Sequence, residues 1–443
     1  MKRTGMVGGV LRYLSDPLRK NSLFLMATHG VIALFGFFFW RIAEGLYGTG
    51  DVEVAVTLVS AVLLLHTLAR LGIDIGLIRF LPREEDKAGM INTSFTMVGI
   101  VSAGMAVIFI LGIRVWTPAL GCIREDPGYA LLFIVFTVAV GLVELLRQGV
   151  FVAYRKTEWS LAIEVVAGLR LPLLFAFLSL GALGIFISWG LAGVTALVAG
   201  VLLLMVIQRT YRPVPKIRGK VVGDMVRFSL GNYVAESFRE IPGFVLPIIV
   251  VSVFTARAGT GSGTGMGAYF YIAWTMASVV MMISYATGSS LLAEGSAEPA
   301  GFRRNATRAV RFMLLLLAPA IVLVFVFGDN VLAWFGAPYS ENAFSLLRVL
   351  SVSAIPIAVN TVYVTQKRVQ RKMWPVVWVY AFVAAFTVGV GYALIDRMEL
   401  LGIGVAWLAA NCVVAGVAGS LMSRAWLQAR REKNQGNADA STS

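Results

Sequence analysis

Long apolar runs separated by short polar segments dominate the chain between residues 22 and 426. Each run has about 20 residues or more, which is the length an α-helix needs to cross the ~30 Å hydrocarbon core of a bilayer. The pattern therefore predicts an all-α polytopic membrane protein with about twelve transmembrane helices. The predicted spans are 22–46, 53–78, 90–113, 129–153, 160–181, 184–207, 226–254, 265–293, 308–328, 342–366, 374–395 and 401–426.

Composition excludes a soluble globular protein. Hydrophobic residues make up 58% of the chain and charged residues 14%, against roughly 25% charged in an ordinary soluble domain. The formal net charge of +14 would favour nucleic-acid binding in a soluble protein. In a membrane protein the positions of the positive charges indicate the orientation of the spans, because Lys and Arg collect in cytoplasmic loops.

The basic residues alternate in number from loop to loop. Of the 38 Lys and Arg residues, 28 fall in the segments expected to be cytoplasmic and six at membrane depth. The predicted outward loops hold only four: Arg114, Arg124, Arg257 and Arg397. This bias predicts a multi-pass protein of the cell (cytoplasmic) membrane with both the N-terminus and the C-terminus in the cytoplasm, and no nucleic-acid partner.

The most polar internal connection runs from Arg209 to Asp224 and holds two prolines. It predicts a linker between two six-helix halves, residues 1–211 and 212–429. Residues 430–443 are polar and predict a disordered cytoplasmic tail. Both halves follow a basic stretch with a similar helix start, Ser22-Leu23 and Ser229-Leu230. Two halves with even numbers of spans indicate parallel repeats related by an axis along the membrane normal.

Six arginines lie at membrane depth: Arg41, Arg70, Arg147, Arg170, Arg239 and Arg348. Charges there are expensive unless they are paired or hydrated, so they mark functional positions. Acidic residues at helical spacing accompany most of them: Glu44, Asp74, Glu144, Glu236 and Glu240. One interpretation is a hydrated cavity between the halves in which the arginines bind an anionic group, most plausibly phosphate. Asp74, Glu144, Glu236 and Glu240 would then tune the arginines or carry protons. The alternative is that each set is a local ion pair that holds helices together.

Other chemistry is sparse. His29 and His66 lie in apolar spans. A histidine in such a place is more often neutral and hydrogen-bonded to a carbonyl than a proton carrier. The glycine-rich stretch 259–267 lacks the ending of a phosphate loop and predicts a flexible external loop. The sequence shows no His/Cys metal spacing, no nucleophile elbow and no nucleotide-binding domain. We therefore expect no metal, no cofactor and no catalytic residue.

Several strings resemble the multidrug/oligosaccharidyl-lipid/polysaccharide (MOP) exporter superfamily, and within it the polysaccharide transporter or O-antigen flippase branch. The second span ends in a glycine-rich segment with an Arg-Phe pair. The eighth begins with a tyrosine-rich segment and ends in Leu-Ala-Glu-Gly. The strings are LGIDIGLIRFLP (71–82), AYFYIAW (268–274), SSLLAEGS (289–296), FGAPY (335–339) and LLR (346–348).

The resemblance implies two six-helix bundles around a central cavity with alternating access. It implies a transporter rather than an enzyme, which moves a polyprenyl-(di)phosphate-linked oligosaccharide to the outer leaflet for surface polysaccharide assembly. Its partners would be the lipid-linked glycan, membrane lipids and glycosyltransferases or a polymerase of the same pathway, and it would act as a monomer. The alternatives are a cation-coupled multidrug exporter of the same superfamily, a peptidoglycan-precursor flippase, which usually has two further spans, and a membrane-embedded glycan polymerase or ligase.

Overall fold

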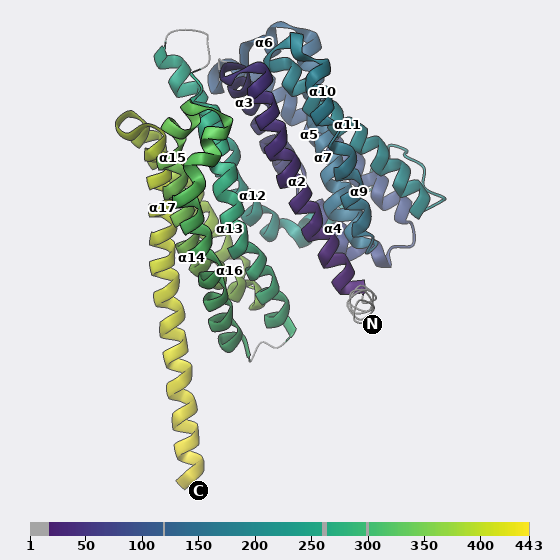
Figure 1. Ribbon diagram of the computed structural model, residues 1–443. Coiled ribbons are helices and arrows are strands. Elements are labelled where there is room, and N and C mark those ends of the chain that lie inside the picture. Colours follow the sequence, from purple (N-terminus) through teal and green to yellow (C-terminus); the bar gives the residue numbers. More distant parts are fainter. Residues whose placement is uncertain (1–16, 118–119, 259–263, 298–300, 443) are drawn as a thin grey trace, which may run out of the picture. The chain divides into compact units, whose positions relative to one another are not determined.

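A computed structural model describes residues 17–117, 120–258, 264–297 and 301–442. All regular structure in these residues is helical. Figure 1 labels the main helices. Up to the polar linker they are α2 (Pro17–Tyr47), α3 (Thr49–Ala69), α4 (Ile73–Phe80), α5 (Lys87–Trp116), α6 (Gly121–Glu125), α7 (Pro127–Glu144), α8 (Phe151–Ala153), α9 (Thr157–Ala167), α10 (Arg170–Ala176) and α11 (Ala182–Ile207). Short turns of other helix types are η1 (Leu81–Arg83), η3 (Leu145–Val150) and η4 (Leu178–Leu180).

The helices after the linker include the longest ones in the described residues. They are α12 (Gly219–Ala258), α13 (Met266–Ala297), α14 (Phe302–Phe335), α15 (Ala337–Val352), α16 (Ala354–Val369) and α17 (Met373–Thr442). Helix α17 is two helices joined at Glu399, whose φ of 49° is not helical.

Eleven helices in the described residues are long and apolar enough to cross a membrane. The last of them, Met373–Arg424, has 52 residues and contains the break at Glu399. Since about 20 residues suffice for one crossing, it holds two spans. The prediction of an all-α polytopic protein with about twelve transmembrane helices is confirmed.

The chain divides by contacts into two compact units, residues 1–268 and 269–443. The seventh span, α12, falls with the first unit because it packs against α3, α4 and α5. The division therefore comes later than the predicted boundary at 211/212, which stays a prediction about the repeat. Helical backbone continues to Thr442, where the sequence predicted a disordered tail from residue 430. The segment begins with Arg430, Arg431, Glu432 and Lys433, which all favour helix and continue the preceding one.

Helices α4 and α12 approach each other closely. Gly72 has a φ of +73° and ends the break between α3 and α4. A Cβ on Gly72 would lie 2.7 Å from the Cβ of Ser229 and 2.9 Å from that of Tyr233. One turn along α4, Gly76 packs directly against Met225 in the same way. The Tyr233 hydroxyl donates to the carbonyl of Leu68 at 2.6 Å, which fixes α12 across the break.

The polar linker before α12 is docked on the first unit. Tyr211 is fully buried in a core cluster with Leu81, Met90 and Leu204, and burial raises the pKa of its hydroxyl to about 12. The Asn92 side chain donates to the carbonyl of Arg212 at 2.8 Å. The buried Tyr211 ring anchors the polar linker to the core, which explains why the linker has a defined position on the first unit.

Asp86, just before α5, fixes the end of the linker. Its carboxylate pairs with Lys216 at 3.4 Å and with Arg218. It also accepts the backbone N–H of Gly89 as the N-cap of α5. The pKa of Asp86 is lowered, first by the hydrogen bond from Gly89. Burial opposes this with a smaller effect, and the nearby cations Arg218 and Lys216 lower the pKa further.

Spans four and ten end in the same backbone motif. Arg155 and Arg371 both have left-handed φ, 56° and 58°. In each case the next residue, Lys156 or Lys372, donates its N–H to the carbonyl five residues earlier, which is the Schellman pattern of a helix end. The positions correspond in a six-plus-six arrangement, so this motif agrees with the predicted repeat.

Candidate functional site

Three membrane-spanning helices of the first unit are interrupted, and an arginine lies at each interruption. Arg70 is the C-cap of α3, where the chain turns through Leu71 and Gly72. Arg147 lies in η3, a π-helical stretch that interrupts the fourth span. Arg170 begins α10, after a break at residues 168–169 in the fifth span. The sequence predicted continuous helices here. Broken helices and π-helical stretches at membrane depth are typical of binding sites.

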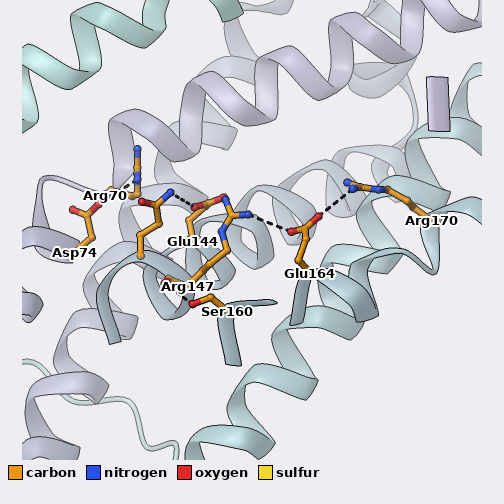
Figure 2. A network of polar contacts seen from close by, with 8 residues as sticks. Arg70, Asp74, Glu144, Arg147, Ser160, Glu164 and Arg170 are labelled. Atoms are coloured by element: carbon orange, nitrogen blue, oxygen red, sulfur yellow. Dashed lines mark hydrogen bonds and ion pairs between the residues drawn. The ribbon is translucent and has the colours of Figure 1, made fainter. Parts of the chain in front are cut away.

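Arg147 lies at the centre of a buried polar network that joins two of these breaks (Figure 2). Its guanidinium binds Glu144 on its own span and donates to Glu164 of α9 at 3.2 Å. The other oxygen of Glu164 pairs with Arg170 at 3.1 Å. The backbone carbonyl of Arg147 accepts the hydroxyl of Ser160 at 2.9 Å. Glu164 is the bridging residue, since it holds an arginine on each side.

The third break lies beside this network. Arg70 pairs with Asp74 of α4 at 3.2 Å, and Figure 2 shows this pair next to Glu144 and Arg147. Gly149 of η3 packs against the backbone of Asp74, because a Cβ there would be 3.2 Å from the Asp74 Cα. The π-helical turn that carries Arg147 thus lies directly on the helix that carries Asp74.

The network is largely buried and balanced in charge. Its six charged side chains are only 9–17% exposed, and three arginines face three carboxylates. Buried ion pairs of this kind offset much of the desolvation penalty of each charge. The sequence left open whether these arginines are ion-paired or face a cavity. The structure shows that Arg70, Arg147 and Arg170 are ion-paired, and their role in substrate binding stays a prediction.

The remaining deep arginines differ in their surroundings. Arg239 of α12 lies between Glu236 and Glu240, at 2.6 and 2.5 Å, three residues before the helix-breaking Pro242. Arg41 lies in the last two turns of α2. Beside it the Glu44 carboxylate accepts the hydroxyl of Thr49 at 2.6 Å.

Arg348, in the second unit, makes no ion pair with any described carboxylate. It is exposed, and its guanidinium carbon lies 3.8 Å from the ring centre of Phe344 and 5.5 Å from that of Phe325. At 1.5 Å per residue it is about 17 Å along the span that begins at Ala337. Inside a membrane an unpaired charge costs about 3 kcal/mol or more. A side chain held at that cost, with no carboxylate partner, is available to an anion.

Sequence reasoning missed several members of these networks. Glu164 was too far from Arg170 for a simple helical pair, and Gln148 and Ser160 carry no charge. A usable signal was a glycine two residues from each arginine, in Arg70-Leu-Gly72, Arg147-Gln-Gly149 and Gly168-Leu-Arg170. Small residues allow the breaks and close contacts that place these arginines.

Glu53 is a second missed residue. It is fully buried at the start of α3. It accepts the backbone N–H groups of Gly265 and Gly267, each at 2.8 Å, and the hydroxyl of Thr264 at 3.3 Å. A carboxylate at the N-terminus of α13 is favoured by its free N–H groups. Of the glycine-rich stretch expected to be a loop, residues 264–267 are therefore anchored, and 259–263 lie outside the described residues.

No group of three or more His, Cys, Asp or Glu side chains in the described part of the chain is placed to hold a metal ion.

Comparisons with known proteins find structures but no sequence relatives. No family model matches the sequence, and no curated protein matches it. Among solved structures, the chain is similar to an inward-facing multidrug resistance MATE family transporter of the MOP superfamily, with a TM-score of 0.66 and 17% identity over 89% of this chain and 96% of that one. It is similar to the lipid II flippase MurJ in an inward closed conformation, with a TM-score of 0.71 and 10% identity over 90% and 87%. A Vibrio cholerae MATE transporter gives 0.59 and 15% over 94% and 98%.

These neighbours are membrane transporters and a flippase, and their folds cover nearly the whole chain. The expected superfamily fold is confirmed by structures that share little sequence with this chain. This multi-pass membrane protein has the fold of the multidrug/oligosaccharidyl-lipid/polysaccharide exporter superfamily.

Proposed function

We propose that this protein is a flippase, not an enzyme, which moves a polyprenyl-phosphate- or diphosphate-linked oligosaccharide from the cytoplasmic to the outer leaflet of the cell membrane. It would work by alternating access, with both termini in the cytoplasm. A flippase for a lipid-linked cargo is one of the activities named among its structural neighbours. The polar glycan would cross through the protein while the lipid tail stays in the bilayer.

One observation carries the choice of an anionic cargo. Five deep carboxylates are each bound by arginine: Asp74, Glu144, Glu164, Glu236 and Glu240. Arg348, by contrast, forms no ion pair with a carboxylate of the described residues. A transporter of cationic drugs needs carboxylates that are free to bind the drug, and these five are engaged. A deep arginine without a carboxylate partner favours a phosphate group as the ligand.

The ion-paired arginines have a place in this proposal. A guanidinium offers five N–H donors, and Arg147 already divides them between two carboxylates. An incoming phosphate would compete with those carboxylates rather than meet a free cation. We propose that Arg348 makes the first contact with the phosphate, and that Arg70, Arg147, Arg170, Arg239 and Arg41 exchange partners during transport.

The test uses purified protein in liposomes with a fluorescent polyprenyl-diphosphate-linked glycan. The movement of this lipid between leaflets is followed by chemical quenching of the outer leaflet. Wild-type protein should accelerate it, and Arg348→Gln should remove most of the acceleration, whereas Arg308→Gln, an exposed arginine elsewhere, should not. Export of a cationic dye without any glycan movement would instead identify a multidrug exporter and sink the proposal.

A further inference from the structure

A cavity of about 510 Å³ lies in the first unit, outside the network of deep arginines. It lies between the end of α4 and the start of α12. Two phenylalanines and four charged side chains contribute to its lining: Phe80, Phe228, Arg83, Glu84, Asp224 and Arg227. Its size is within the range of small-ligand sites, about 300–1,000 Å³.

The cavity lies beside the first residues of two helices that are long and apolar enough to cross a membrane. The candidate span of α12, Val221–Ala258, begins at a residue that lines the cavity, and that of α5, Lys87–Trp116, begins three residues before the lining residue Met90. Ile78 and Leu230, each two residues along the chain from a lining phenylalanine, expose 40% and 50% of their surface. A molecule held here has its polar part at the headgroup level and apolar side chains alongside for its tails.

The charged side chains that line the cavity have no partner among the described residues. The side chains of Arg83, Glu84, Asp224 and Arg227 make no ion pair or hydrogen bond with a described residue. A few residues away the opposite holds, because Asp86 binds both Lys216 and Arg218. Two cations and two carboxylates that line one cavity without pairing are placed for a ligand that carries both signs.

We propose that this cavity binds the headgroup of a zwitterionic phospholipid with a primary ammonium, that is, a phosphoethanolamine group. The arginines would bind the phosphate, since guanidinium contacts phosphate oxygens in a bidentate way. The carboxylates of Glu84 and Asp224 would accept hydrogen bonds from the ammonium, which has three N–H donors, as a lysine does. The net charge of the four side chains is zero, which matches a neutral zwitterion and disfavours a diphosphate with its several negative charges.

The Phe228 ring forms part of an apolar wall of the cavity. The guanidinium carbon of Arg79 lies 4.2 Å from the centre of this ring, and Phe80 meets the ring edge-on at 5.6 Å. The aromatic pair is thus held by a neighbouring cation and forms an apolar wall of the cavity. The proposed selectivity comes from the carboxylates, because a trimethylammonium headgroup has no N–H to donate to them.

The test is native mass spectrometry of the full-length protein released from nanodiscs. The probes are phosphatidylethanolamine, phosphatidylcholine and phosphatidylglycerol with identical acyl chains. We expect phosphatidylethanolamine to be retained about tenfold more than either other lipid, as for loss of one hydrogen bond to a charged group. Asp224→Asn and Arg227→Gln should each remove this preference, and Glu84→Gln and Arg83→Gln repeat the test. Arg308→Gln and Glu341→Gln, exposed positions in the second unit, should leave it unchanged.

Three results would overturn the assignment. Stronger retention of phosphatidylglycerol that depends on the arginines alone would identify an anion site. Equal retention of all three lipids would show that the cavity selects no headgroup. Displacement of the lipid by an equal concentration of soluble phosphoethanolamine would show that the ligand is not a lipid. The assay measures the mass of the bound lipid and no transport, so its outcome is independent of the flippase proposal.

Discussion

Replacing Glu164 by glutamine removes the charge that bridges Arg147 and Arg170. The carboxylate is 9% exposed and pairs with both arginines, at 3.2 and 3.1 Å. Breaking a buried pair by removing one partner costs about 3–5 kcal/mol, because the other charge stays buried. We take the lower end, about 3 kcal/mol, because Arg147 keeps Glu144 as a partner. At about 2–4 °C per kcal/mol for a unit of this size, Glu164→Gln should lower the melting temperature by about 6–12 °C.

The assay is thermal unfolding in detergent, with Glu125→Gln as the matched control. Glu125 is exposed, so its change should stay within about 0.5 kcal/mol. The double variant Glu164→Gln/Arg170→Gln should be more stable than the sum of the single changes by at least about 1 kcal/mol, as expected for residues in one network. A melting temperature that follows the control, or strictly additive single effects, would refute the bridging role of Glu164.

Three further outcomes follow from the packing and the charges. Gly72→Ala should destabilise the protein by at least about 2 kcal/mol, since it forces an L-residue into a left-handed φ and a clash with Ser229. Gly104→Ala, with nothing within 4 Å of its Cβ, should be neutral or stabilising in the same melting assay, and equal effects would contradict the close approach of α4 and α12. Glu53→Gln should cost about 2 kcal/mol, the value of hydrogen bonds to a charged acceptor, and speed amide exchange at Gly265 and Gly267; unchanged exchange would contradict the cap. Because the folded pKa of Asp86 is depressed, its contribution is complete above the unfolded pKa of about 3.9 and is lost as pH falls through the lower folded value. Melting followed from pH 7 to pH 3 should show a loss below pH 4 of less than about 1 kcal/mol for this exposed group, and Asp86→Asn should remove it; an identical acid limb in the variant would refute the assignment.

The span count and the identity of the fold were predictable because both depend on properties that the sequence states directly. A bilayer requires about 20 apolar residues per crossing and sorts basic residues to one side. Even the break at Glu399 is consistent with the prediction, which ended one span at residue 395 and began another at 401. The strings around residues 71–82 and 268–274 resemble a superfamily whose fold this chain shares with the solved structures.

The interruptions within the spans were not predictable in the same way. Apolar length is the same for a continuous helix and for one broken at Leu71 or at residue 168, so hydropathy does not reveal them. Partners across helices, such as Glu164 for Arg147, depend on which helices are neighbours. The docked linker is a similar case, since nothing in its polar composition shows that Tyr211 enters the core.

The proposed function depends most on Arg348, the deep arginine that would bind the phosphate of the lipid-linked cargo. It is tested most directly by the rate at which a fluorescent polyprenyl-diphosphate glycan crosses liposomes that contain wild-type protein or Arg348→Gln. We predict rapid crossing with wild type and at least about a tenfold slower rate with the variant at equal protein level, the effect of losing one charged hydrogen bond. Equal rates for the two proteins, or no crossing with wild type while a cationic dye is exported, would contradict it.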